Sequence, residues 1–315
     1  MIVDNADVVK KSKKEHSVGK SKRKFLLAVD GSNQSFEAVR YAGRLFPPDR
    51  TEVVLFNVLT QFPESFWDIE TETGNHHEDD RIRSWEVEQN QKVDIFMEKA
   101  RRLFMEQNFP QNAVQIKIQA RKAGIARDIV HESRDNYDGV VVGRWGTSML
   151  KDFLWGSVAN KLIGRLTHTA VCVVGGTPLV GKILLAIDAS EGAKRTIDYV
   201  GAMADGSRWE VSLIHAIRDV DGIKSEHIEK IMSFIFKEAA DHFEKAGFNR
   251  NKIHTRIVSP VPSRTGAIVM EALNGGYGTI VVGRRGFSNV KEFDMGRVSN
   301  KVIQMAREMA VWIVT

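Results

Sequence analysis

The sequence predicts an α/β protein of two tandem domains, each an open sheet of five parallel strands flanked by helices. Short apolar runs, typical of buried strands, alternate with segments of helical periodicity, and this alternation favours parallel strands joined by right-handed crossovers. The whole series occurs twice along the chain. A length of 315 residues also suits two domains of about 150 residues each.

An internal duplication supports the two-domain prediction. Residues 137–174 align without gaps on residues 277–314, and 17 of the 38 aligned pairs are identical. Chance does not produce this level of identity, so the second domain is a copy of the first. We expect a basic tail at 1–23, a first domain at 24–175, a linker at 176–181 and a second domain at 182–315.

Each copy is predicted to contain the same series of elements. In the first copy we expect strands at 24–30, 53–59, 114–120, 139–142 and 171–174, and helices at 35–45, 126–133 and 157–166. In the second copy we expect strands at 182–188, 211–217, 253–259, 279–282 and 311–314, and helices at 193–203 and 266–273. The first copy has 18 extra residues between its first and fourth strands, and we expect this insertion in the polar, acidic segment 61–80.

The net charge of +5 comes largely from the first 24 residues, where lysines occur in runs without apolar periodicity. A basic arm that touches nucleic acid or anionic lipid is one interpretation of this segment. We favour a solvated, disordered tail, because no aromatic side chain stands among the lysines. The rest of the chain is close to neutral, so we do not expect the body of the protein to bind nucleic acid.

Other protein classes also fit the sequence poorly. It has no run of about 18 apolar residues and no apolar segment near the N-terminus, so we expect no membrane span, no secretory signal and a cytoplasmic location. Cys172 lies in an apolar run and is expected to be a small buried residue rather than a nucleophile. His76 and His77 stand among acidic residues without the spacing of zinc ligands, which indicates a solvated loop rather than a metal site.

A glycine loop between a strand and a helix is the strongest functional signal. Gly143, Gly146 and Gly156 follow the fourth strand, and the next helix opens at Ser157. Glycine lets the backbone come close to a ligand, and the unpaired N–H groups and dipole of a helix N-terminus favour phosphate. Asp30 ends the first strand, and if the first and fourth strands flank the switch point of the sheet, its carboxylate faces the same crevice.

These residues resemble the universal stress protein family, specifically its ATP-binding branch. The resemblance rests on the run from Leu27 through Asp30 to Ser32 and on the glycine spacing with Ser157 after the third glycine. It covers residues 24–315 as two tandem domains. It implies a Rossmann-like, adenine nucleotide α-hydrolase-like fold that holds ATP in the crevice.

The resemblance also implies a role for each matching residue. Asp30, together with Ala28 and the backbone at Val58, is expected on the adenine side, while Gly143 and Gly146 let the chain pass close to the ribose and phosphates. Backbone N–H groups and a hydroxyl for the β- and γ-phosphates are expected from Gly156, Ser157 and Val158. Mg²⁺ or Mn²⁺ would then be held by phosphate oxygens and water rather than by side chains.

The second copy departs from the family pattern, because Arg297 takes the place of the serine and Ala189 that of Gly31. The arginine could grip a phosphate or fill the space of the γ-phosphate, so AMP, ADP or no nucleotide remain as alternatives there. Trp145, between the first two glycines, could stack on the ligand or cap the core. The residues of this second site are expected to be Asp188, Gly283, Gly286, Gly296, Arg297 and Val298.

These patterns predict a nucleotide-gated adaptor of the stress response, whose bound state biases contacts with a protein partner. The sequence offers no positioned general base or nucleophile, so fast catalysis is not expected, although slow ATP hydrolysis or autophosphorylation at Ser157 remains an alternative. An enzyme of the adenine-nucleotide α/β class and an assembly module with incidental nucleotide binding are two further alternatives. The apolar fifth strands are expected to pair the two copies as an internal pseudo-dimer, and two chains could associate as a homodimer.

Overall fold

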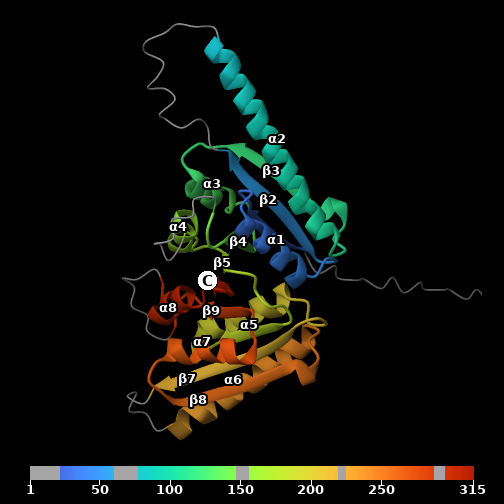
Figure 1. Ribbon diagram of the computed structural model, residues 1–315. Helices are drawn as coiled ribbons and strands as arrows, with labels where there is room; N and C mark the ends of the chain where they lie inside the picture. The colour runs from blue at the N-terminus through green and yellow to red at the C-terminus, as the bar shows by residue number, and fades with distance from the viewer. Residues whose placement is uncertain (1–21, 60–76, 147–155, 219–224, 287–294) are drawn as a thin grey trace, which may run out of the picture.

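The computed structural model describes residues 22–59, 77–146, 156–218, 225–286 and 295–315. Its ten described strands form one sheet in the order β3-β2-β1-β4-β5-β10-β9-β6-β7-β8 (Figure 1). Neighbouring strands pair in parallel in each half of this sheet, and only β5 and β10 pair antiparallel. The predicted pair of five-stranded parallel sheets is therefore confirmed, and their edges join into one sheet.

The elements of the two halves follow the duplication. The first half contains β1 (Arg23–Ala28), α1 (Asn33–Leu45), β2 (Thr51–Leu59), α2 (His77–Met105), β3 (Val114–Ala120), α3 (Ile125–Glu132), β4 (Gly139–Gly143), α4 (Ser157–Arg165) and β5 (Ala170–Val174). The second half contains β6 (Lys182–Ala186), α5 (Glu191–Met203), β7 (Glu210–Arg218), α6 (Ser225–Lys245), β8 (Ile253–Val261), α7 (Arg264–Gly275), β9 (Thr279–Gly283), α8 (Arg297–Met305) and β10 (Ala310–Val314). Short 3₁₀ turns, Gln111–Ala113 and Arg250–Lys252, precede β3 and β8.

Alternate side chains of each strand enter two different cores, because successive residues of a strand point to opposite faces of the sheet. In β1, Phe25 and Leu27 belong to the core under α1, α2, α5 and α6, whereas Leu26 belongs to the core under α3, α4, α7 and α8. Helices therefore cover both faces (Figure 1). This double burial explains why the strands are continuous apolar runs.

The long helices α2 and α6 were not among the sequence predictions. The helix α2 is rich in charged residues, and its buried stripe is narrow. The residues of this stripe that face the hydrophobic core are Val93, Met97, Ala100 and Phe104. With 29 residues against 21 in α6, α2 takes up part of the predicted insertion, and the rest of segment 61–80 up to residue 76 lies outside the described residues. None of the described helices combines the length and the apolar character that a bilayer span requires.

Two strand boundaries differ from the predictions. The strand β1 begins at Arg23, inside the predicted tail, where Arg23 forms an ion pair with Asp138. The rest of that tail, residues 1–21, lies outside the described residues. At their other ends β1 and β6 stop at Ala28 and Ala186, two residues before the acid that the sequence placed at the strand end.

The two halves meet along an antiparallel ladder between β5 and β10, which confirms the predicted pairing of the fifth strands. Cys172 lies opposite Trp312, and both are fully buried. The Trp312 ring packs edge-on against Phe25 and Phe46 from the first half, at centroid distances of 6.2 Å. The hydrophobic cores therefore continue across the seam.

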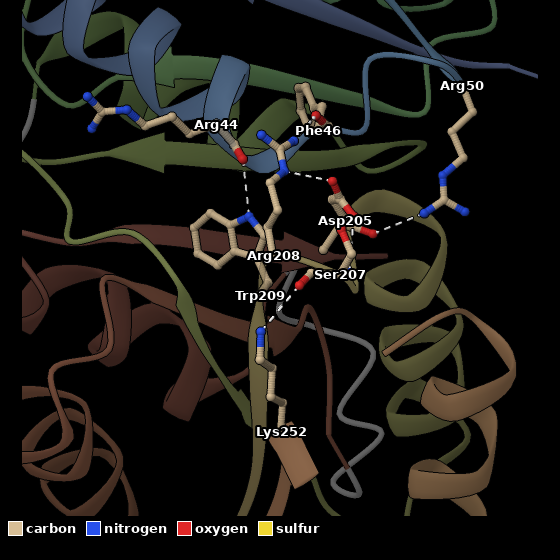
Figure 2. A network of polar contacts seen from close by, with 9 residues as sticks. Arg44, Phe46, Arg50, Asp205, Ser207, Arg208, Trp209 and Lys252 are labelled. Atoms are coloured by element: carbon tan, nitrogen blue, oxygen red, sulfur yellow. Dashed lines mark hydrogen bonds and ion pairs between the residues drawn. The ribbon is translucent and has the colours of Figure 1, made fainter. Parts of the chain in front are cut away.

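Reciprocal hydrogen bonds hold the helix ends on one side of this seam (Figure 2). Arg208 donates to the carbonyl oxygen of Phe46 at 3.1 Å, and Arg50 donates to that of Ala204 at 3.3 Å. Phe46 and Ala204 cap the C-termini of α1 and α5, where cationic side chains are favourable. Each half thus provides a hydrogen-bond donor to the C-terminal end of a helix in the other half.

Two equivalent tyrosines at the seam should differ in their contribution to stability. The Tyr41 hydroxyl contacts Thr279 Oγ1 at 3.0 Å and accepts a hydrogen bond from Trp312 Nε1 at 2.9 Å. The Tyr199 hydroxyl is buried without a hydrogen-bond partner in the described part of the chain. We expect Y41F to lower the free energy of unfolding by about 1–3 kcal/mol, because the Trp312 N–H loses its acceptor. Y199F should be neutral or stabilising in chemical denaturation, and equal losses in the two variants would contradict this account.

Candidate functional site

The candidate site lies where β4 leaves the sheet, beside the end of β1. The backbone N–H of Arg144 donates to Val174 at 2.8 Å, and the N–H of Gly156 donates to the Arg144 carbonyl at 2.8 Å. These bonds bring the two ends of the predicted glycine loop together, so that α4 starts directly beside the end of β4. The intervening residues 147–155 lie outside the described residues.

The Asp30 carboxylate lies against the glycine loop, as the sequence predicts. A Cβ atom at Gly146 would be 2.6 Å from Asp30 Oδ2, so any other residue there would displace the carboxylate. Asp30 Oδ1 accepts hydrogen bonds from the backbone N–H of Ser32 at 3.0 Å and from its hydroxyl at 2.6 Å. Gly156 completes the group, since its Cβ would be 3.6 Å from the Gly146 nitrogen.

The second half repeats this geometry. Asp188 Oδ1 accepts hydrogen bonds from the backbone N–H and the hydroxyl of Ser190, and a Cβ at Gly286 would be 2.7 Å from Asp188 Oδ2. The N–H of Gly296 donates to the carbonyl oxygen of Arg284 at 2.8 Å. The sequence therefore brings together the same set of acid and glycines twice.

The helix that follows each loop begins without an acidic residue in its first turn. Gly156 is the N-cap of α4 and supplies no side chain, and the Ser157 side chain is exposed. The positive end of the α4 dipole is therefore not neutralised by a neighbouring carboxylate in its own first turn. In α8 the exposed Arg297 adds a further positive charge at the same position.

Three apolar residues, at the ends of β1 and β2 and at the start of α4, make up what we call the apolar wall. Ala28, Val58 and Val158 all border the core under α3 and α4, and Ala186 and Val298 occupy the equivalent places in the second half. A planar apolar group could pack on such a wall while its polar substituents reach the loop. Gly143 is buried, and a Cβ there would lie 3.1 Å from backbone atoms of Gln34 in α1, so the close approach of α1 also requires a glycine at this position.

Two polar residues of the second strands escaped the sequence predictions. Asn57 Nδ2 donates to the Val29 carbonyl at 2.7 Å, and His215 Nδ1 lies 2.8 Å from the Ile187 carbonyl at the equivalent place. A carbonyl only accepts, so Nδ1 of His215 carries the proton. Each side chain braces the residue that precedes the aspartate. The sequence signal for this contact is a polar residue at the same position of two otherwise apolar strands, β2 and β7.

The turns before the first helices also differ between the halves. Gly31 adopts a φ of 80°, and a Cβ there would be 2.8 Å from the Phe96 ring of α2. Its counterpart Ala189 is exposed and is not among the described residues with positive φ. Trp145 is half-buried, with the Arg144 guanidinium 5.8 Å from its ring centre.

Metal-binding clusters are absent from the part of the chain that the structure describes, where no three or more His, Cys, Asp or Glu residues are grouped as ligands. His76 lies outside that part, and His77 is the first residue of α2. His131 lies in α3, and His168 contacts the hydroxyl of Ser133 at 3.1 Å.

Comparison with known proteins gives matches over both halves. Residues 22–174 and 180–314 each match the model of the universal stress protein family. The universal stress protein YxiE of Bacillus subtilis (strain 168) is 30% identical over 142 residues, which are 41% of this chain and 95% of that protein. The crystal structure of a universal stress protein from Archaeoglobus fulgidus DSM 4304 covers 93% of this chain and 98% of its own, with 20% identity and a TM-score of 0.61. A universal stress protein solved in complex with cAMP covers 43% of this chain and 97% of its own, with 23% identity and a TM-score of 0.35.

The serine of the first turn should stabilise the first half more than its counterpart stabilises the second. The Ser32 hydroxyl donates to Asp30 and accepts a hydrogen bond from the N–H of Ser35, which caps α1. Ser190 binds Asp188 but makes no side-chain cap to α5. We expect S32A to lower the free energy of unfolding by about 1 kcal/mol and S190A by less, measured by chemical denaturation. A larger loss in S190A would show that the cap is not the stabilising contact.

Proposed function

The chain belongs to the universal stress protein family, and on that premise we propose that its first half binds ATP between Asp30 and the start of α4. The second half would bind a different adenine nucleotide or a shorter phosphate chain. The bound state would then bias contacts with a protein partner in the cytoplasm, as in a nucleotide-dependent adaptor of the stress response.

The contact between Asp30 and Gly146 carries this proposal. It places an acceptor for ribose or base donors beside the glycine loop, and Gly156, the N-cap of α4, lies against the same loop. Adenine would pack on the wall that includes Ala28 and Val58, and the phosphates would lie at the positive end of α4 with Ser157 and Val158. Mg²⁺ or Mn²⁺ would be held through the phosphates.

Binding rather than rapid turnover fits the chemistry of these side chains. Asp30 already accepts two hydrogen bonds from Ser32, and its other oxygen lies against the glycine loop. That arrangement suits a positioning role more than a general base directed at a phosphate. Slow hydrolysis or autophosphorylation at the exposed Ser157 would need positioning alone.

Arg297 sets the selectivity of the second site in this proposal. Its side chain is exposed at the first position of α8, where it can turn toward a phosphate and bind two oxygens at once. Because this side chain is exposed, it is better placed to bind a phosphate than to fill the space of the γ-phosphate. We therefore propose that the arginine replaces contacts that Ser157 makes in the first half.

Calorimetric titration of the full chain with ATP, ADP and AMP in the presence of Mg²⁺ tests the first site. We expect ATP to bind, and G156V to weaken it by at least about tenfold, or about 1.4 kcal/mol, because a Cβ at 156 would lie 2.9 Å from the Arg144 carbonyl oxygen. The matched control is G164V, in the same helix, where no atom lies within 4 Å of the added Cβ. It should bind as the unmodified protein does.

Two outcomes would redirect the proposal. No binding by any nucleotide would contradict it and favour an assembly module, and several turnovers per minute would favour an enzyme. Normal binding by G156V would show that the phosphates lie elsewhere.

The second site is tested in the G156V background, where binding by the first half is weakened, and each variant is compared with G156V alone. We expect R297S to weaken binding of ADP by about tenfold, the loss of one charge-assisted contact of about 1.4 kcal/mol. A gain in ATP affinity would instead show that the arginine fills the γ-phosphate space. Calorimetry measures both, and R285M, which removes an exposed arginine from the same loop, shows the effect of net charge alone.

A further inference from the structure

The side chain of Arg144 crosses from the first half into the second. Its backbone belongs to the glycine loop of the first site, yet its guanidinium donates to Ile303 at 3.0 Å through both terminal nitrogens and to Ala306 at 2.9 Å. These carbonyls close the C-terminal end of α8, the helix that begins at the second site. The Arg144 side chain is 0% exposed.

Arg284 makes the same contact in the opposite direction. It stands in the glycine loop of the second site, is 6% exposed, and donates to Ile163 at 3.0 Å and to Leu166 at 2.5 Å. Those carbonyls close the C-terminal end of α4, whose other end is the phosphate seat of the first site.

Backbone bonds complete a closed circuit. The carbonyl of Arg144 accepts the N–H of Gly156, the N-cap of α4, and the carbonyl of Arg284 accepts the N–H of Gly296, the N-cap of α8. Each of these two helices is therefore held at its N-terminus by the arginine of its own half and at its C-terminus by the arginine of the other half.

These contacts are strong enough to transmit a displacement. A guanidinium at a helix C-terminus is favoured by the dipole, and carbonyls left buried without a donor are costly. Burial lowers the pKa of Arg144 to about 10, Arg307 adds repulsion and Glu308 opposes it, so the side chain stays charged at neutral pH. A nine-residue helix moves as one unit, so a shift at its N-terminus reaches its C-terminal carbonyls.

We infer that Arg144 and Arg284 are positioning residues, each of which holds the phosphate-binding helix of the opposite half and couples the two nucleotide sites. This inference rests on the proposed function of the first site. A ligand that shifts the N-terminus of α4 also shifts the carbonyl oxygens that accept the hydrogen bonds of Arg284. Because Arg284 belongs to the glycine loop of the second site, that loop shifts as well. Couplings of this kind typically change affinity by about 5- to 150-fold.

The test measures the first site while changing the second half. In calorimetric titrations with ATP, the part of the binding heat that is lost in G156V is assigned to the first site. We expect R284M to reduce that affinity by about tenfold, within the coupling range above, although Arg284 belongs to the other half. R284K, which keeps a cation that can reach one carbonyl, should recover part of the loss. The matched control is R285M, which removes an equal charge one residue away from an exposed side chain and should leave the first site unchanged.

A second readout is made on the unmodified chain, with G156V as the comparison. Hydrogen exchange of the unmodified chain should show that ATP protects amides in α8 as well as in α4, and that this protection of α8 is lost in G156V. A purely structural arginine would lower the melting temperature without changing ATP affinity or exchange in the distant helix.

The possible failures are distinguishable. If ATP binds to R284M as tightly as to the unmodified chain, and α8 exchanges equally with and without ATP, the coupling is wrong and the first site stands. If the unmodified chain binds no ATP, the coupling and the proposed function are both overturned.

Discussion

The antiparallel ladder between β5 and β10 determines the arrangement of the rest of the molecule. Its register centres on Cys172 and Trp312, which occupy equivalent positions of the two copies, and on either side Val174 lies opposite Ala310 and Val171 lies opposite Ile313. Such a pairing relates the halves by an approximate twofold axis, so a contact made in one direction across the seam recurs in the other. The hydrogen bonds of Arg144 and Arg284 to opposite helix ends are one result. The ladder also leaves β3 and β8 as the two edges of the sheet.

The symmetry breaks where the core has to be filled. Trp312 is much larger than its counterpart Cys172, and the space for its ring comes from Gly139, where a Cβ would be 3.1 Å from the indole. Thr279 stands in the place of that glycine in the second half, and its hydroxyl contacts Tyr41. Large and small residues thus compensate across the seam, as close packing requires. A larger residue at position 139 would crowd the Trp312 ring, so the residues on the two sides of the seam have to match in size.

The sequence predicted the strands and the contact of Asp30 with the glycine loop because both follow from local pattern and from the order of parallel strands. It did not predict α2 and α6, since the core-facing stripe of α2 is narrow and the exposed Ile231 and Phe234 of α6 blur its periodicity. The contact of Arg144 with α8 was also out of reach, because it depends on how the two halves are placed. The one hint of this contact in the sequence is that both copies have an arginine at this position.

Two of the residues near the candidate sites differ between the copies, but both copies have the arginine that crosses the seam. Near the candidate sites, Arg297 of the second half occupies the position of Ser157, and His215 occupies the position of Asn57. The arginine of the glycine loop is the same in both halves. A change in a crevice alters the contacts of one ligand. A change in a seam arginine removes a hydrogen-bond donor from the C-terminal carbonyls of a helix in the opposite half, and under the proposed coupling it also affects the other site. Under the proposed function, a duplicated domain held in this way can diverge in what each half binds while the two arginines keep α4 and α8 joined across the seam.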